Sequence, residues 1–175
     1  MAVILIATAK AANANAYVDE TEAGLYLSDN RLYETKWAAA VSDDRKSALI
    51  WATKLLDLAF DWNGLKRTSE QALRWPRSSV YDLDGQFYDS ETIPSPLKHA
   101  TAELALSLLR DDRTADPSLL GRGIASVTVG PISVEASAEQ VMSLIPDYIV
   151  LLLRALGTTV PGAQQGDKVV SLVRV

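Results

Sequence analysis

The sequence predicts a mainly α protein, a small helical bundle with a β-hairpin and extended N- and C-terminal arms. Apolar residues make up 48% of the 175 residues, which is enough to build one hydrophobic core. Several segments repeat apolar residues at helical spacing, and short β-prone segments surround a Gly-Pro pair and lie near both ends of the sequence. We therefore expect a single helical domain at 1–156, followed at 157–175 by a flexible linker and a C-terminal tail.

The first thirty residues contain a β-prone segment, a linker and a helix. Residues 2–8 are apolar and predict a short strand, and the alternating Ala and Asn residues at 12–16 predict a linker. Asp19 can cap a helix, because Glu22 follows three residues later in the arrangement of a capping box. A helix is expected from about Glu20 to Ser28, ending near Asp29-Asn30.

Two further helices are expected before residue 64. Thr35 can cap a short helix that carries Trp37 and ends near Val41, and Ser42 can cap a longer helix that Asn63-Gly64 ends. The apolar residues of the longer helix follow one stripe, which predicts a face that packs against the core rather than a platform for stacked bases. The stripe consists of Ala48, Trp51, Ala52, Leu55, Leu58, Ala59 and Trp62.

A long connection at 65–93 leads to the next helix. Trp75-Pro76-Arg77 can plug the core, since Trp buries a large area and Pro stiffens a loop, or can anchor a neighbouring subunit. Asp84-Gly85 predicts a tight turn of a small hairpin. Ser95-Pro96 begins a helix that reaches about Arg110. Its apolar residues cover more than one face, which indicates a helix central to the core or shared with a partner subunit.

The last third of the chain contains the predicted hairpin, at about 122–136, where β-branched residues alternate around Gly130-Pro131. An apolar helix is expected from Pro146 to Leu156. Strand edges in the hairpin and the tail favour pairing with another chain, although the hairpin can instead pack on its own core. The residues expected at a subunit interface are Trp75, Pro76, Arg77, Val127, Val129, Ile132, Val134, Val169, Val170, Leu172 and Val173.

Composition argues against several kinds of functional site. The net charge is −5 and no basic patch is present, which disfavours strong binding of phosphates by charge alone. The absence of cysteine excludes disulfides and thiolate metal sites. His99 has no nucleophile or second base assigned to it, and its expected neighbour is Glu103, one helical turn later. We expect no catalytic, cofactor or metal site, an acidic loop at 82–91 that is a solvated turn, and no membrane span.

The sequence resembles a known phage family in an ordered set of blocks that covers about residues 10–135. The blocks are 12–18 (ANANAYV), 23–26 (AGLY), 37–39 (WAA), 46–53 (KSALIWAT), 61–64 (DWNG), 71–77 (QALRWPR), 93–94 (IP), 98–105 (KHATAELA) and 129–132 (VGPI). This family is labelled DnaT-like single-stranded-DNA-binding, and its genes typically lie among those for head and tail morphogenesis.

The resemblance, together with similarity to head–tail adaptors, implies a structural protein of the virion neck that is not an enzyme and is assembled in the host cytoplasm. On this hypothesis twelve copies form a ring between the portal protein and a tail terminator, stopper or tail-tube protein. DNA passes through the lumen without sequence-specific binding, and an acidic wall fits such a passage because like charges repel. The alternative, which the family label suggests, is a replication accessory protein that binds single-stranded DNA.

Overall fold

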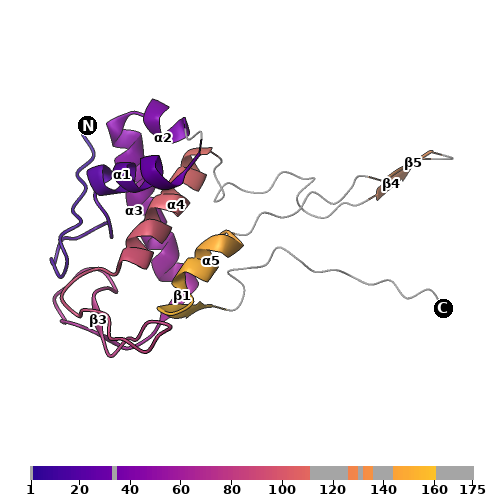
Figure 1. Ribbon diagram of the computed structural model, residues 1–175. Helices are drawn as coiled ribbons and strands as arrows, with labels where there is room; N and C mark the ends of the chain where they lie inside the picture. The colour runs from indigo at the N-terminus through magenta and orange to yellow at the C-terminus, as the bar shows by residue number, and fades with distance from the viewer. Residues whose placement is uncertain (1, 33–34, 111–125, 130–131, 136–143, 161–175) are drawn as a thin grey trace, which may run out of the picture.

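The computed structural model describes residues 2–32, 35–110, 126–129, 132–135 and 144–160, and it confirms a mainly α fold with a small β component (Figure 1). The helices are α1 (Glu20–Asn30), α2 (Lys36–Ala39), α3 (Ser42–Ala59), α4 (Ser95–Arg110) and α5 (Asp147–Leu153). The strands form antiparallel pairs: β1 (Phe60–Trp62) with β6 (Gly157–Thr159), β2 (Leu65–Lys66) with β3 (Arg77–Ser78), and β4 (Ser126–Val129) with β5 (Ile132–Glu135).

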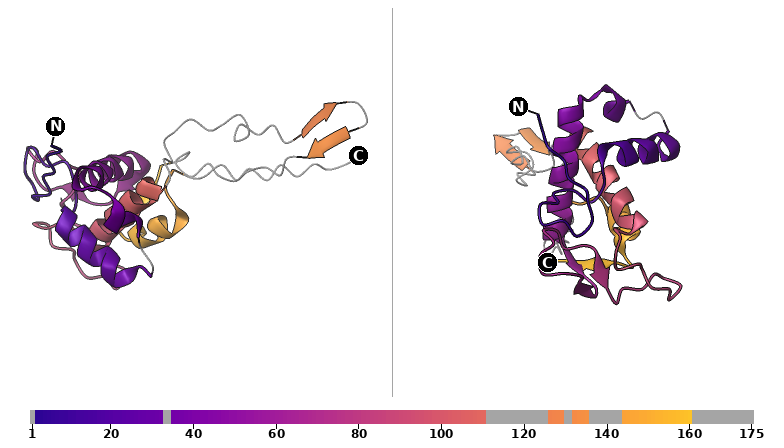
Figure 2. Two further views of the ribbon diagram at one scale, coloured as in Figure 1. Left: turned by 90° about the horizontal axis from the view of Figure 1, so that it is seen from above. Right: turned by 90° about the vertical axis from the view of Figure 1, so that its left-hand side faces the viewer.

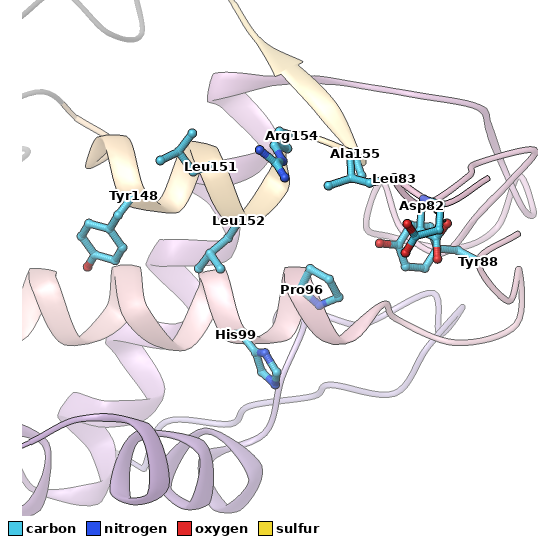
Figure 3. A pocket seen from close by; sticks show the side chains of 11 residues that line it. Asp82, Leu83, Tyr88, Pro96, His99, Tyr148, Leu151, Leu152, Arg154 and Ala155 are labelled. Carbon is cyan, nitrogen blue, oxygen red and sulfur yellow. Dashed lines mark hydrogen bonds between the residues drawn. The ribbon is translucent and has the colours of Figure 1, made fainter. Parts of the chain in front are cut away.

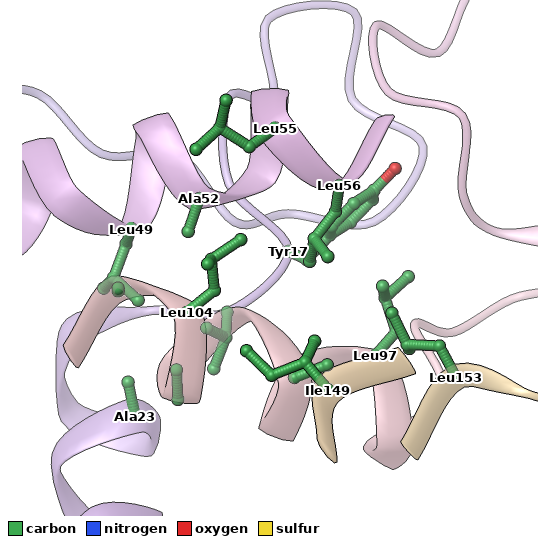
Figure 4. Packing of buried hydrophobic residues seen from close by; sticks show 14 of the residues in the cluster. Tyr17, Ala23, Leu49, Ala52, Leu55, Leu56, Leu97, Leu104, Ile149 and Leu153 are labelled. Atoms are coloured by element: carbon green, nitrogen blue, oxygen red, sulfur yellow. The ribbon is translucent and has the colours of Figure 1, made fainter. Parts of the chain in front are cut away.

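Helix α4 is the centre of the bundle, as one of the two sequence interpretations predicted. It contacts α1, α2, α3 and α5, and every residue from Ala100 to Ser107 is buried. Figure 4 shows Leu104 and Leu97 of α4 between side chains of α3 and α5. A helix that is apolar on several faces gains most by such placement, because each buried Leu stabilises the fold by about 2 kcal/mol.

Helix α1 begins at the predicted cap. The Asp19 carboxylate accepts a hydrogen bond of 2.8 Å from the backbone N–H of Glu22. The Glu22 carboxylate does not complete the predicted capping box, because it binds the ammonium of Lys98 on α4 at 2.8 and 3.0 Å. Asp19 therefore fixes the start of α1, and Glu22, the third residue of α1, links this helix to α4 at the centre of the bundle.

Helix α3 departs from the prediction at both ends. It ends at Ala59 instead of near Asn63, since Phe60 and Trp62 alternate with an exposed Asp61 and pair with β6. Gly64, with a φ of 70°, forms the turn after β1 instead of ending a helix. At its start Val41 occupies the N-cap position, and the hydroxyl of Ser42 donates to Glu20 of α1.

The N-terminal segment lies against the bundle and is not the predicted strand. The amide side chain of Asn15 accepts from the N–H of Ile6 at 2.7 Å and donates to the carbonyl of Ile4 at 2.9 Å. The N–H of Val3 donates to Asp43 at the start of α3. Side chains thus satisfy backbone groups that a partner strand would otherwise bind. The predicted linker at 12–16 contributes Ala14 and Ala16 to the buried residues.

The connection at 65–93 lies at the end of the bundle where β1 is found (Figures 1 and 2). It contains the predicted small hairpin: Tyr81 and Phe87 pair across it, the N–H of Asp82 donates to the carbonyl of Gln86 at 2.8 Å, and Gly85 has a φ of 79°. The peptide bond between Trp75 and Pro76 is cis.

Strands β4 and β5 confirm the predicted hairpin around Gly130-Pro131, with Val127 opposite Val134 and Val129 opposite Ile132. The C-terminal arm, including Val169, Val170, Leu172 and Val173, falls outside the described residues. None of the helices in the described part of the chain is long and apolar enough to span a membrane.

Candidate functional site

A groove of about 550 Å³ opens between α4, α5 and the hairpin at 81–87 (Figure 3). We call it the α5 groove. Its walls combine rings, leucines, two carboxylates and one guanidinium, so it offers both apolar surface and charged groups to a ligand. The lining residues are Asp82, Leu83, Asp84, Tyr88, Pro96, His99, Tyr148, Leu151, Leu152, Arg154 and Ala155.

Helix α5 supplies one wall of the α5 groove. Its fully buried residues, Ile149 and Leu153, pack toward α4 and fix the rotation of the helix. Tyr148, Leu151 and Leu152 therefore face outward, with 41%, 64% and 38% of their surface exposed. The sequence predicted only that α5 is apolar nearly all round. It could not indicate that three large side chains remain uncovered on one side.

Arg154 provides the cation of the groove at the end of α5. Its guanidinium is exposed and lines the groove, and no described residue forms a hydrogen bond or ion pair with it. Such an arginine can bind an anionic group of a ligand without first breaking a contact with the described residues.

The hairpin at 81–87 and the adjacent Tyr88 supply the opposite wall. Asp82 is committed to the turn, because its Oδ1 accepts from the N–H groups of Asp84 and Gln86 at 2.9 and 2.7 Å. Burial raises the pKa of Tyr88, so its hydroxyl stays protonated at neutral pH. Outside the groove, Tyr81 and Phe87 pair on the hairpin with ring centroids 4.1 Å apart, and both are exposed.

His99 of α4 is among the residues that line the groove, and its side chain points toward α1 (Figure 3). Its ring stacks on Tyr26 of α1, with centroids 4.1 Å apart and an interplanar angle of 11°. The predicted neighbour, Glu103, is linked to it through Tyr26, whose hydroxyl donates to Glu103 Oε1 at 3.2 Å. Burial lowers the pKa of His99, so its imidazole is neutral at neutral pH.

The tryptophans divide into a buried group and one exposed residue. Trp37, Trp62 and Trp75 are buried, as core packing predicts. Trp51 is 40% exposed, with the Lys54 ammonium 6.0 Å from its ring, so its predicted place in the core is wrong. The face of α3 that is buried includes Leu49 and Leu56, and this leaves Trp51 and Leu58 at its solvent edge.

The Trp75-Pro76-Arg77 block packs within the chain. Trp75 and Pro76 are buried, and the Arg77 guanidinium donates to backbone carbonyls, including those of Asn63 at 2.6 Å and Gly64 at 2.7 Å. This is the packing role that the sequence allowed. The contact of these residues with another subunit stays a prediction. Contact of Val127, Val129, Ile132 and Val134 with another subunit also stays a prediction, because only the backbone of these residues is described.

The acidic loop gives no sign of a metal site. Within the described residues, no group of three His, Asp or Glu side chains is placed to hold a metal ion. Glu91 instead pairs with Lys10 and with Arg67, and these two cations lower the pKa of its carboxyl group.

Comparison with known proteins gives one match. The family described as "Putative DnaT-like ssDNA binding protein" matches residues 1–175. No curated protein and no solved structure matches the chain significantly. The family description points to DNA binding rather than to a bacteriophage head–tail connector, a portal or DNA ejection, so it does not support the predicted neck protein and favours the alternative prediction, a protein that binds single-stranded DNA. Since the match extends over residues 1–175, the chain belongs to the DnaT-like single-stranded-DNA-binding family.

Proposed function

We propose that this protein binds single-stranded DNA in the α5 groove, with unpaired bases against its rings and the sugar-phosphate backbone beside Arg154. The observation that carries the proposal is the arrangement of Tyr148, Tyr88 and His99 around one groove that also contains the Arg154 guanidinium, which pairs with no described residue. The family description supports the same class of ligand.

The chemistry of the groove suits unpaired bases. Each base that stacks on an aromatic side chain contributes about 1–3 kcal/mol, and stacking tolerates any sequence because every base has a π-face. Bases inside a duplex are already stacked on one another and are not free to enter such a groove. We therefore expect the protein to prefer a single strand over a duplex.

The charge of the protein sets a limit on the affinity. The net charge is −5, and Asp84 lies on the hairpin opposite Arg154. Few phosphates can be neutralised, so binding depends mainly on stacking. With one phosphate contact, the logarithm of the association constant should fall with the logarithm of salt concentration at a slope of about −0.7.

Fluorescence anisotropy of a labelled oligothymidine, titrated with the full chain over a range of salt concentrations, tests the proposal. Tyr148→Ala should weaken binding about 5- to 150-fold, which corresponds to the loss of one stacked base. Tyr148→Phe keeps the ring and loses only the hydroxyl, so it should bind more tightly than Tyr148→Ala.

Trp51→Ala is the matched control, because Trp51 is the exposed ring that lies on α3 and outside the groove. Unchanged affinity in this variant supports the groove. A loss with Trp51→Ala and none with Tyr148→Ala would move the site to α3. Equal affinity for duplex and single strand, or a Kd above about 10⁻⁴ M at physiological salt, would refute single-strand binding.

A further inference from the structure

One carboxylate lies inside the bundle, on a helix whose other buried residues are mostly apolar. Glu103 is on α4 and is 4% exposed. Burial of a carboxylate is unfavourable unless cations and hydrogen-bond donors compensate it, and an apolar residue of similar size is often at least as stabilising. The presence of Glu103 at this position therefore points to a role other than packing.

Three side chains from two other parts of the bundle compensate this charge. Arg31, which follows α1, donates through Nε to Glu103 Oε1 at 2.9 Å and to Oε2 at 2.8 Å, and its Nη2 also donates to Oε2. The Tyr26 hydroxyl of α1 donates to Oε1 at 3.2 Å, and the Tyr148 hydroxyl of α5 donates to Oε2 at 3.5 Å. One residue of α4 thus links α1 to α5.

Both links reach the α5 groove. Toward α5, Arg31 is held between the carboxylate and Tyr148, with its guanidinium carbon 5.2 Å from the centroid of the Tyr148 ring. Toward α1, Tyr26 stacks on His99. Tyr148 and His99 are two of the three rings that line the groove.

We propose that Glu103 is a positioning residue that sets the orientation of the Tyr148 and His99 rings in the α5 groove. It holds Tyr148 through the hydroxyl and through Arg31, and it holds His99 through Tyr26. The proposal rests on the proposed function, since the rings positioned in this way are those assigned to the bases.

The negative charge is central to this role. The Arg31 side chain is 33% exposed, so without an anion beside it the guanidinium can turn toward water and leave the Tyr148 ring. Glutamine is nearly the same size as glutamate, but it carries no charge and has one accepting oxygen instead of two, so it binds the guanidinium more weakly. Glu103→Gln therefore weakens the positioning effect with little change in volume.

The test uses the fact that His99 is the sole histidine of the chain. Its ring protons give isolated NMR signals whose positions depend on the stacked Tyr26 ring. In Glu103→Gln, without DNA, these signals should move. The pKa of His99 should also fall, because the charge of Glu103 raises it. Affinity for the labelled oligothymidine should fall about tenfold, as expected from partial loss of stacking at two rings.

Thr101→Val is the matched control on the same helix. Thr101 is fully buried and its hydroxyl donates to the carbonyl of Leu97 at 2.8 Å, so the variant also removes a buried polar group from α4. Thermal unfolding of both variants separates loss of stability from loss of positioning. Thr101→Val should leave the His99 signals and the oligothymidine affinity unchanged.

The outcomes distinguish the two proposals. Unmoved His99 signals in Glu103→Gln, or oligothymidine affinity equal to that of the unaltered protein, would overturn the positioning role. If the unaltered protein does not bind oligothymidine, the proposed function fails, and the NMR signals alone still decide whether Glu103 orients the rings. If Glu103→Gln does not fold, Tyr26→Phe cuts only the link to His99 and should move its signals. Unmoved signals in that variant also overturn the proposal.

Discussion

The hydroxyl of Tyr17 makes a buried hydrogen bond whose removal should measurably destabilise the protein. Tyr17 is fully buried beside α3, and its hydroxyl donates to Asp57 Oδ1 at 2.5 Å. Trp62 Nε1 donates to the same oxygen at 3.1 Å. Tyr17→Phe removes one donor and leaves the ring in place, so no large cavity forms.

The expected loss follows from the charge of the acceptor. A hydrogen bond to a charged group contributes about 1.5–3 kcal/mol to stability. Tyr17→Phe should therefore lower the free energy of unfolding by about 2 kcal/mol, and the midpoint of thermal unfolding should fall by about 4–8 °C for a chain of this size. Urea unfolding followed by circular dichroism at neutral pH measures this difference.

The effect should shrink in acid. Burial raises the pKa of Asp57, whereas the hydrogen bond from Tyr17 acts in the opposite direction and favours the ionised carboxylate. Without the Tyr17 hydroxyl the folded-state pKa of Asp57 rises further. The stabilisation by Tyr17 is thus fully present above this pKa and disappears as pH falls through it. The unaltered protein and the variant should converge in stability at low pH.

Tyr81→Phe is the matched control, because Tyr81 lies exposed on the hairpin. Its free energy of unfolding should stay within about 0.5 kcal/mol of the unaltered protein, as is usual for surface substitutions. If Tyr17→Phe also stays within that range at neutral pH, the buried hydrogen bond does not stabilise the fold and the reasoning is wrong.

Two further predictions concern backbone and core. Gly64→Ala should destabilise the protein much more than Gly85→Ala. Both glycines have a positive φ, so both variants strain the backbone. A Cβ at 64 would also lie 2.1 Å from the Ser78 carbonyl oxygen, whereas a Cβ at 85 meets nothing within 4 Å. Gly85→Ala should cost about 1–2 kcal/mol from the left-handed backbone alone, and equal urea midpoints for the two variants would contradict this. Leu97→Ala should lower the free energy of unfolding by about 2–5 kcal/mol, measured in the same way, because Leu97 is fully buried on α4; a loss below about 1 kcal/mol would show that the site collapses around the smaller residue.

Local signals in the sequence predicted the helices well. Asp19 caps α1 through its own side chain, and Ser95-Pro96 begins α4 as expected. Both depend on residues close in sequence. The several apolar faces of α4 predicted a helix that is either central to the core or shared with a partner subunit, and its contacts with α1, α2, α3 and α5 place it at the centre.

The errors concern interactions over a long distance in sequence. The stripe on α3 included Trp51 and Leu58 and omitted Leu49, because periodicity gives a face only to within one helical position. The end of α3 depends on pairing between Phe60 and Thr159, which no local pattern reveals. The N-terminal segment finds hydrogen-bond partners in Asn15, a side chain, where a strand partner was expected.

The α5 groove could not be predicted from the sequence. Its rings come from three segments, represented by Tyr88, His99 and Tyr148, which meet only in the fold. Nor does the sequence show that Arg154 is left without a partner among the described residues. The sequence contains one indication of the groove, which is that α5 is apolar on nearly every side. A short helix cannot bury all of its faces against α4, so some of this apolar surface must remain exposed.

The short sheet of β1 and β6 supports one wall of this groove. Helix α5 has seven residues, too few to persist alone in water. Pairing of Trp62 with Gly157, and the bond from the Asn63 N–H to the Leu156 carbonyl at 2.9 Å, fasten the chain just after α5. A Cβ at 157 would lie 2.6 Å from the Asp61 carbonyl oxygen, so glycine permits this close pairing. These contacts hold the wall that carries Tyr148 in place without a ligand, so on the proposed function a bound strand would not have to order that wall itself.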